Sequence, residues 1–222
     1  MIFLKKDLKV LRQSKLFTGI KGEEICLVLK CLSPAEKAFT KGEYILRSGD
    51  RIKSMGLVLS GCVHIIKEDY WGNRTILTEV HPGQLFGEAY ACFQAEELQV
   101  EVLSVRSSVV LFFDTNRILT PCSDGCVYHT RLVQNLVSVL AEKNLALTGK
   151  IEHLSQRRTR DKILSYLSDV SQKQGNCDFT VPFNRQELAD YLCVDRSALS
   201  NELSKLKKEG ILDYEKNRFR LL

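Results

Sequence analysis

The last forty residues constrain the fold most, because they carry start and turn signals for two short helices in close succession. Asn184 and Glu187 have the spacing of a capping box, in which each side chain hydrogen-bonds the backbone amide of the other residue at a helix N-terminus. The apolar residues that follow at helical intervals predict a first helix over 187–192. A turn over 193–195 comes next, and Cys193 stands where such turns usually have glycine, so we expect a modestly strained backbone there.

A second helix is predicted over 196–208, with Asp195 as its cap and Gly210 in the left-handed conformation that often follows a helix. The segments 211–214 and 218–222 then predict a β-hairpin. The inward-facing residues of the second helix are Leu199, Leu203 and Leu206.

Helix, turn, helix and hairpin in this order are the plan of a winged helix-turn-helix. The second helix would present polar and basic side chains at its start, and these are the types that bind base edges and phosphates. The alternative is a solvated polar face on an ordinary helical hairpin. Charge does not decide between the two, because residues 196–222 hold seven basic and four acidic side chains. We predict that the DNA-binding residues are Arg185, Arg196, Ser197, Ser200, Asn201 and Lys205.

The pattern over residues 36–115 is typical of short β-strands. Seven of the thirteen glycines fall here, and they separate short apolar runs such as 57–60, 63–66 and 108–113. Strands punctuated by glycine about every ten residues predict a β-sandwich or barrel. Residues 69–73 carry the turn residues of a hairpin tip. The preceding segment, 1–35, has helical spacing and a basic character.

From about residue 126 the apolar period becomes that of a helix. Apolar residues recur at alternating intervals of four and three over some three heptads, with Asn144 as one polar member. This pattern favours a dimerisation helix in which Asn144 would fix the register, and the alternative is an amphipathic helix packed on its own domain. The series, called the seam below, is Val133, Val137, Leu140, Asn144, Leu147, Ile151 and Leu154.

Composition narrows the class of protein. The 222 residues are 44% hydrophobic and 27% charged, which is close to the globular average and argues against a wholly disordered chain. No apolar run approaches the ~18 residues of a membrane span. With no secretory signal at the N-terminus, we expect a cytoplasmic protein whose eight cysteines are reduced. The net charge of +5 suggests an anionic partner without naming it.

Four segments in this order resemble the Crp/Fnr family of bacterial transcription regulators, and the resemblance covers nearly the whole chain. The segments are 41–50 (KGEYILRSGD), 55–63 (MGLVLSGCV), 82–88 (PGQLFGE) and the helix-turn-helix 185–206.

The resemblance implies an α+β fold with three parts. These are a cyclic-nucleotide-binding-like β jelly roll with N-terminal helices (1–118), a long dimerisation helix (119–154) and a winged helix-turn-helix (155–222). It further implies a homodimer that binds a roughly palindromic operator in double-stranded DNA, responds to a small-molecule or redox signal and contacts RNA polymerase. We expect no enzyme activity, because the chain lacks a glycine-rich phosphate loop, Gly-x-Ser-x-Gly and His-Glu-x-x-His. A third class of function, besides a DNA-binding regulator and an enzyme, is a binding module that does not act on DNA. The predicted C-terminal helices argue against this class.

The resemblance also locates an effector pocket, at Gly87, Glu88, Leu98 and Gln99. Family members that bind a cyclic nucleotide use a Gly-Glu pair for the ribose and phosphate, and an Arg-Ser pair to neutralise the phosphate. Here Gly87 and Glu88 are present, but Leu98 and Gln99 stand at the Arg-Ser position. A phosphate without a cation would lose its hydration uncompensated, so we expect that the signal is not cyclic AMP.

Cysteine and histidine offer another kind of sensor. The iron–sulfur members of the family cluster three cysteines near the N-terminus, and this chain has only Cys26 and Cys31 there. Cys122, Cys126 and His129 are spaced to share one helical face, and Cys126 lies seven residues before the first seam residue. Thiolate and imidazole ligands suit zinc, haem iron or an iron–sulfur centre. The alternative is that these cysteines are small buried hydrophobic residues, so the cofactor stays unassigned.

A second pair, Cys62 and His64, has one residue between its members. On a strand the two side chains would face the same side, which makes them weaker ligand candidates.

Overall fold

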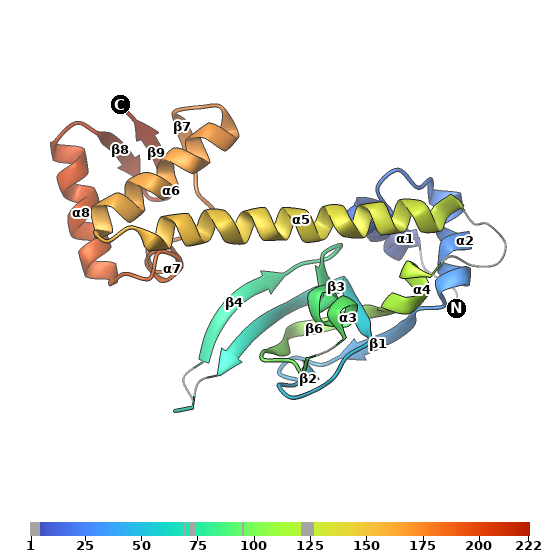
Figure 1. The fold of residues 1–222 in the computed structure, drawn as a ribbon. Helices are drawn as coiled ribbons and strands as arrows, with labels where there is room; N and C mark the ends of the chain where they lie inside the picture. Colours follow the sequence, from blue (N-terminus) through green and yellow to red (C-terminus); the bar gives the residue numbers. More distant parts are fainter. Residues whose placement is uncertain (1–4, 69, 72–73, 95, 121–126) are drawn as a thin grey trace. The chain divides into compact units, whose positions relative to one another are not determined.

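The computed structural model describes residues 5–68, 70–71, 74–94, 96–120 and 127–222, and it has an α+β fold (Figure 1). The chain forms two compact units, Met1–Glu142 and Lys143–Leu222, which are described separately below. The division falls inside α5 (Val127–Ser155), so the predicted dimerisation helix is not a compact unit of its own. None of the described helices is long and apolar enough to cross a membrane.

The N-terminal unit is a β-roll covered by helices (Figure 1). Its strands are all paired antiparallel, in the order β1-β6-β3-β4, with β2 beside β6 and β5 beside β3. They are β1 (Ala35–Phe39), β2 (Tyr44–Leu46), β3 (Ser54–Glu68), β4 (Arg74–Val80), β5 (Leu85–Phe86) and β6 (Glu101–Asp114). The helices are α1 (Lys5–Gln13), η1 (Lys15–Phe17), α2 (Gly22–Leu32), α3 (Glu88–Phe93), α4 (Thr115–Leu119) and the first half of α5.

One expectation for this sheet is wrong: the apolar runs 57–60 and 63–66 belong to a single strand, β3. Gly61 does not end the strand, but sits within it at a positive φ of 86°, where the register with β6 shifts. A Cβ at Gly61 would lie 2.3 Å from Ser108 Oγ, so only glycine permits this close approach of the two strands. The hairpin predicted around 69–73 joins β3 to β4, and most of its tip lies outside the described residues.

The two faces of β3 bury different side chains. Val58 and Val63 face the interior of the β-roll with Val80, whereas Leu57 and Leu59 pack against the helices. On the helix side, α5 contributes Leu132, Leu136 and Val139 to the same core as α1 and α2.

The C-terminal unit is a small helical domain closed by a three-stranded antiparallel sheet of order β7-β9-β8 (Figure 1). Its helix α6 spans Thr159–Gln174. The other elements are β7 (Asp178–Thr180), α7 (Arg185–Tyr191), α8 (Arg196–Lys208), β8 (Leu212–Glu215) and β9 (Arg218–Leu221). The predicted helices and hairpin are therefore all present, and α8 has the predicted bounds.

Candidate nucleic-acid interface and sensor sites

The capping box at the start of α7 is confirmed. The Glu187 amide donates to Asn184 Oδ1 at 3.0 Å, and the Asn184 amide donates to Glu187 Oε2 at 2.7 Å. These two bonds satisfy backbone donors that a helix N-terminus otherwise leaves open, so α7 begins at Arg185, two residues before the predicted start.

The turn between α7 and α8 has the left-handed residue that the sequence predicts at Cys193, with φ of 49°. Its backbone is held on both sides: the Cys193 amide donates to Asp190 O at 3.2 Å, and the Val194 amide donates to Ala189 O at 3.0 Å. From α6, Lys162 Nζ donates to Leu192 O at 3.2 Å. Lys162 was not predicted, because its sequence neighbourhood on α6 gives no sign of the turn that it contacts.

The ends of α8 agree with prediction in position, but one contact differs. Asp195 is the N-cap residue with extended backbone, yet its side chain forms no capping hydrogen bond, so the expected side-chain cap is wrong. At the other end Gly210 is left-handed, with φ of 71°. The Gly210 amide donates to Lys207 O and the Ile211 amide to Leu206 O, which is the Schellman pattern.

Packing leaves one face of α8 open to solvent. Leu199, Leu203 and Leu206 are fully buried and fix the rotation of the helix about its axis. The predicted DNA-binding residues Arg196, Ser197, Asn201 and Lys205 are exposed, and Ser200 is half-buried. Lys205 Nζ lies 3.3 Å from a carboxylate oxygen of Glu202 on the preceding turn. Five of the six predicted residues therefore lie on this one helix.

Arg185, the sixth, is the first residue of α7 and contacts the β8–β9 hairpin, which is called the wing below. Its guanidinium carbon is 4.9 Å from the ring centre of Tyr214 and 5.6 Å from that of Phe219. The same group donates to Lys216 O at 3.1 Å. Burial lowers the pKa of Arg185 from its usual value, and the nearby Tyr214 partly opposes this effect. Arg185 thus attaches the β8–β9 hairpin to α7.

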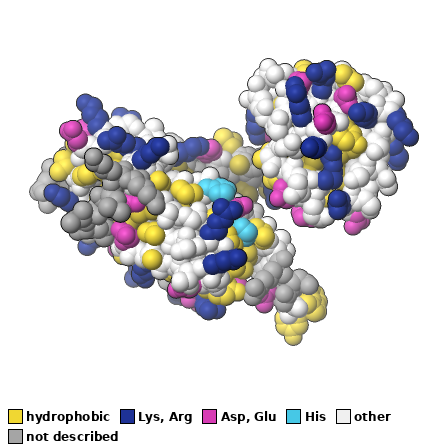
Figure 2. Space-filling model, turned by 180° about the vertical axis from the view of Figure 1, so that it is seen from behind, with side chains coloured by type: hydrophobic (Ala, Val, Ile, Leu, Met, Phe, Trp, Pro, Cys, Tyr) yellow, Lys and Arg dark blue, Asp and Glu magenta, His cyan; other side chains and the backbone are white. Residues whose placement is uncertain are grey.

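A charged cluster that the sequence did not predict joins β7 to the wing. Asp178 on β7 accepts hydrogen bonds from Arg218 Nε at 2.7 Å and from Arg220 at 2.8 Å. The hydrogen bond from Arg218, and to a lesser extent the one from Arg220, lowers the pKa of Asp178 to about 2. In Figure 2, Lys and Arg side chains are spread over the visible face of this unit, among acidic ones.

The effector-pocket residues in the β-roll differ in what they face. Gly87 is left-handed, with φ of 73°, and precedes α3, whose first residue Glu88 is buried. Leu98 is also buried, and its amide and carbonyl bond to Asp50 O and the Gly49 amide. Gln99 is exposed. Leu98 is thus a buried residue whose backbone holds the segment before β6 against Gly49 and Asp50.

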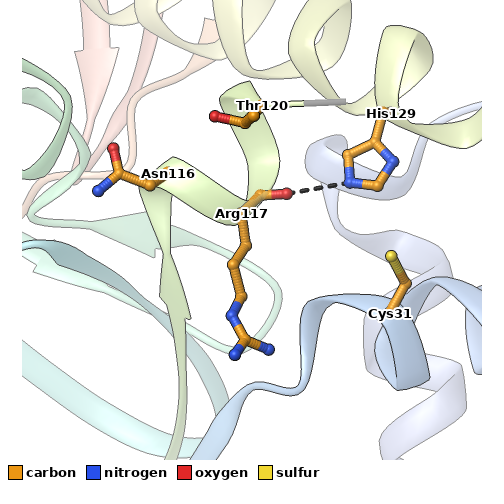
Figure 3. A pocket seen from close by; sticks show the side chains of 5 residues that line it. All are labelled: Cys31, Asn116, Arg117, Thr120 and His129. Carbon is orange, nitrogen blue, oxygen red and sulfur yellow. Dashed lines mark hydrogen bonds between the residues drawn. The ribbon is translucent and has the colours of Figure 1, made fainter. Parts of the chain in front are cut away.

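His129, from the predicted cysteine–histidine set, lines a surface pocket of about 310 Å³ together with Cys31 of α2 and Arg117 of α4 (Figure 3). His129 is buried, and its Nε2 lies 3.0 Å from Arg117 O, which assigns the proton to Nε2. Its Nδ1 has no hydrogen-bond partner among the residues that the structure describes. Cys122 and Cys126 lie outside the described residues.

Comparisons with known proteins agree with both units. The family model for the cyclic nucleotide-binding domain matches residues 36–123, and that for the Crp-like helix-turn-helix domain matches residues 161–222. The chain is 25% identical over 205 residues to the cyclic AMP receptor protein of Thermus thermophilus, covering 91% of this chain and 89% of the relative. It is 20% identical to the transcriptional activator protein FnrL of Cereibacter sphaeroides, covering 82% of this chain and 74% of the relative.

A solved structure supports the fold. The c-di-GMP-responsive global regulator CLP of Xanthomonas campestris superposes with a TM-score of 0.60 at 19% identity, over 90% of this chain and 99% of that one. The two matched domains follow the order predicted from the sequence segments, and together they cover more than half of the chain. The chain belongs to the Crp/Fnr family of transcription regulators.

Proposed function

We propose that the protein is a homodimeric, sequence-specific DNA-binding regulator of transcription, without enzyme activity, whose α8 reads the major groove. The observation that carries this proposal is the division of α8 between two faces. Its leucines are fully buried in the core of the C-terminal unit, while Arg196, Ser197 and Asn201 are exposed at its N-terminal end. Recognition helices of this class contact base edges with their N-terminal residues. By family analogy the regulated partner is RNA polymerase.

Individual roles follow from residue type. Arg196 can form paired hydrogen bonds with guanine, and Asn201 can do so with adenine. Ser197, Ser200 and Lys205 are suited to bases or phosphates on either side. Arg185 completes the proposed surface, and its stacking on Tyr214 also positions the wing.

The α5 seam supports the homodimer. Val137, Leu147 and Ile151 are 58%, 62% and 65% exposed, although all three are large apolar residues. Two other seam residues, Val133 and Leu140, are partly buried against the core of the N-terminal unit, whereas this core leaves Val137 uncovered. Leu147 and Ile151 belong to the C-terminal unit and are exposed as well. A second copy of the helix would bury them and would place Asn144 opposite its counterpart.

For the signal, we propose a molecule or redox change other than cyclic AMP. Leu98 is buried in the core and Gln99 is uncharged, so neither residue can neutralise a cyclic phosphate. Two of the three similar proteins named above are a cyclic AMP receptor and a c-di-GMP-responsive regulator, so effectors differ among proteins of this fold. His129 Nδ1 has no hydrogen-bond partner within the described part of the chain, and the pocket of Figure 3 is therefore the alternative sensor site.

The test is a mobility-shift assay of the full chain with genomic fragments across a range of salt concentrations. We expect sequence-preferring binding that Arg196→Ala weakens by about 1–3 kcal/mol, with relaxed specificity at one base pair. Lys41→Ala in the N-terminal unit is the matched control, because it removes the same charge from another exposed site. Equal losses from both variants, or no preference for any sequence, would contradict the proposal.

A further inference from the structure

Four side chains with metal-binding atoms share one face of the β3–β4 hairpin. Val63 and Val80 lie opposite each other in this ladder, and His64 lies opposite Glu79. Both valines are buried in the β-roll interior. Because successive side chains of a strand point to opposite faces, the neighbours of these valines share the other face. These neighbours are Cys62, His64, Glu79 and His81.

Three of the four side chains converge. Cys62 Sγ, a Glu79 carboxylate oxygen and a His81 ring nitrogen all lie within 4.8 Å of one another. Cys62 Sγ donates to Glu79 Oε1 at 2.8 Å, and His81 Nε2 is 3.9 Å from that oxygen. His64 Nε2 is also 3.9 Å from it. Ligands of one zinc ion are about 3.3–3.8 Å apart, so the cluster needs only small side-chain movements to reach this geometry.

The donor set selects the kind of ion. Thiolate and imidazole suit Zn²⁺ and similar transition metals, whereas Mg²⁺ and Ca²⁺ take oxygen ligands almost alone. Two of the ligands, the Cys62 thiolate and the Glu79 carboxylate, would balance the charge of a divalent ion. The nearby charged group from the adjoining strand is Arg106, which is the register partner of Cys62 and is exposed.

The cluster is also accessible. Cys62 is buried, but Glu79 and His81 have side chains that are 47% and 58% exposed. An ion can therefore reach the site from solvent and take the place of the thiol proton that now bonds Glu79, with release of that proton to solvent. Figure 2 shows histidine side chains on this surface, next to Lys and Arg side chains.

We propose that Cys62, Glu79 and His81 form a binding site for one Zn²⁺-like divalent transition-metal ion on the β3–β4 hairpin. The site is separate from the effector pocket and from the pocket of His129. It does not depend on the proposed DNA-binding function. Its sequence signature is Cys-Val-His on one strand and Glu-Val-His on the next, with the two valines in register.

The experiment titrates the full, reduced and chelator-treated chain with Co²⁺, which reports tetrahedral geometry by its visible absorption and thiolate ligation by a near-ultraviolet band. Zn²⁺ competition then measures affinity. We expect one ion per chain with a thiolate band. Glu79→Gln and His81→Asn should each weaken binding about tenfold or more, and Cys62→Ser should abolish the band.

Two variants are matched controls. Cys92→Ser removes another partly buried thiol that lies near a carboxylate, that of Glu88. His129→Asn removes the imidazole of the other sensor candidate. Both should leave the Co²⁺ spectrum unchanged. Should Cys62→Ser fail to fold, the two exposed positions still decide, with circular dichroism checking the fold. A folded wild type without a thiolate band, or unchanged affinity in both Glu79→Gln and His81→Asn, would overturn the proposal.

Discussion

At Cys193 the sequence predicts a strained backbone, because a residue with a Cβ stands where such a turn usually has glycine. Cys193 is exposed, so its thiol contributes little packing, and it is held left-handed at φ of 49°. This conformation costs an L-residue about 1–2 kcal/mol, while glycine adopts it freely but loses more chain entropy on folding. We therefore predict that Cys193→Gly stabilises the protein by up to about 1 kcal/mol, measured by denaturant unfolding.

The control for this prediction is Cys193→Ala, which removes the thiol but keeps the Cβ. It should leave the free energy of unfolding unchanged within a few tenths of a kcal/mol. Equal stabilisation by alanine and glycine would show that the thiol, and not the backbone, causes the effect.

At the scale of the element, α5 carries some apolar residues that are buried in the core of the N-terminal unit and others that are exposed. Leu147 on the seam and Leu145 beside it are 62% and 72% exposed, so either substitution leaves the core of its own unit intact. Leu147→Glu in both copies would remove two buried leucines from the proposed dimer, at a cost of about 3 kcal/mol or more. We predict that the dimer dissociation constant rises about 100-fold or more, measured by light scattering during size-exclusion chromatography.

Leu145→Glu is the matched control for the seam. It introduces the same charge at an equally exposed leucine that does not belong to the seam series, so the dimer should persist. If both variants have the same mass as the wild type, the seam is not the dimer interface.

The effector pocket predicted in the β-roll leads to a prediction about cyclic AMP binding. A ligand at 100 times its dissociation constant stabilises a protein by about 2.7 kcal/mol. Because the Arg-Ser position holds buried Leu98 and uncharged Gln99, we predict that millimolar cyclic AMP leaves the melting temperature unchanged. AMP is the control for nonspecific effects. A rise of several degrees with cyclic AMP, and none with AMP, would refute this expectation.

These elements also show where sequence reasoning succeeds and where it stops. The α8 bounds could be predicted, because Asp195 and Gly210 mark its ends and three leucines repeat at helical intervals. The strand end predicted at Gly61 is wrong. In a sequence, a glycine that ends a strand cannot be distinguished from a glycine within a strand that lets the neighbouring strand approach closely. The Cys62–His64 pair is visible in the sequence. Its partners, Glu79 on β4 and His81 directly after β4, cannot be assigned from the sequence, because the register across the hairpin depends on tertiary pairing.

At the scale of the whole molecule, DNA affinity should depend on dimerisation. Linking two weak half-site contacts makes the second one intramolecular, which raises affinity by about 10²–10⁴-fold. The number of phosphates contacted also sets the salt dependence, with a slope of about −0.9 per phosphate in a plot of log affinity against log salt. A monomer on one half-site contacts about half as many phosphates as the dimer does on both.

We therefore predict that Leu147→Glu lowers affinity for a palindromic operator about 100-fold or more and halves the salt slope, measured by fluorescence anisotropy. Arg196→Ala should act differently, because it removes a contact from each half-site but leaves the dimer intact. Its affinity should fall with a slope reduced by at most about two units, one for each copy of α8. Leu145→Glu should match the wild type in both quantities. A Leu147→Glu protein that is monomeric yet retains the full slope would mean that a single chain makes all the phosphate contacts, and the two-fold mode of binding would then be wrong.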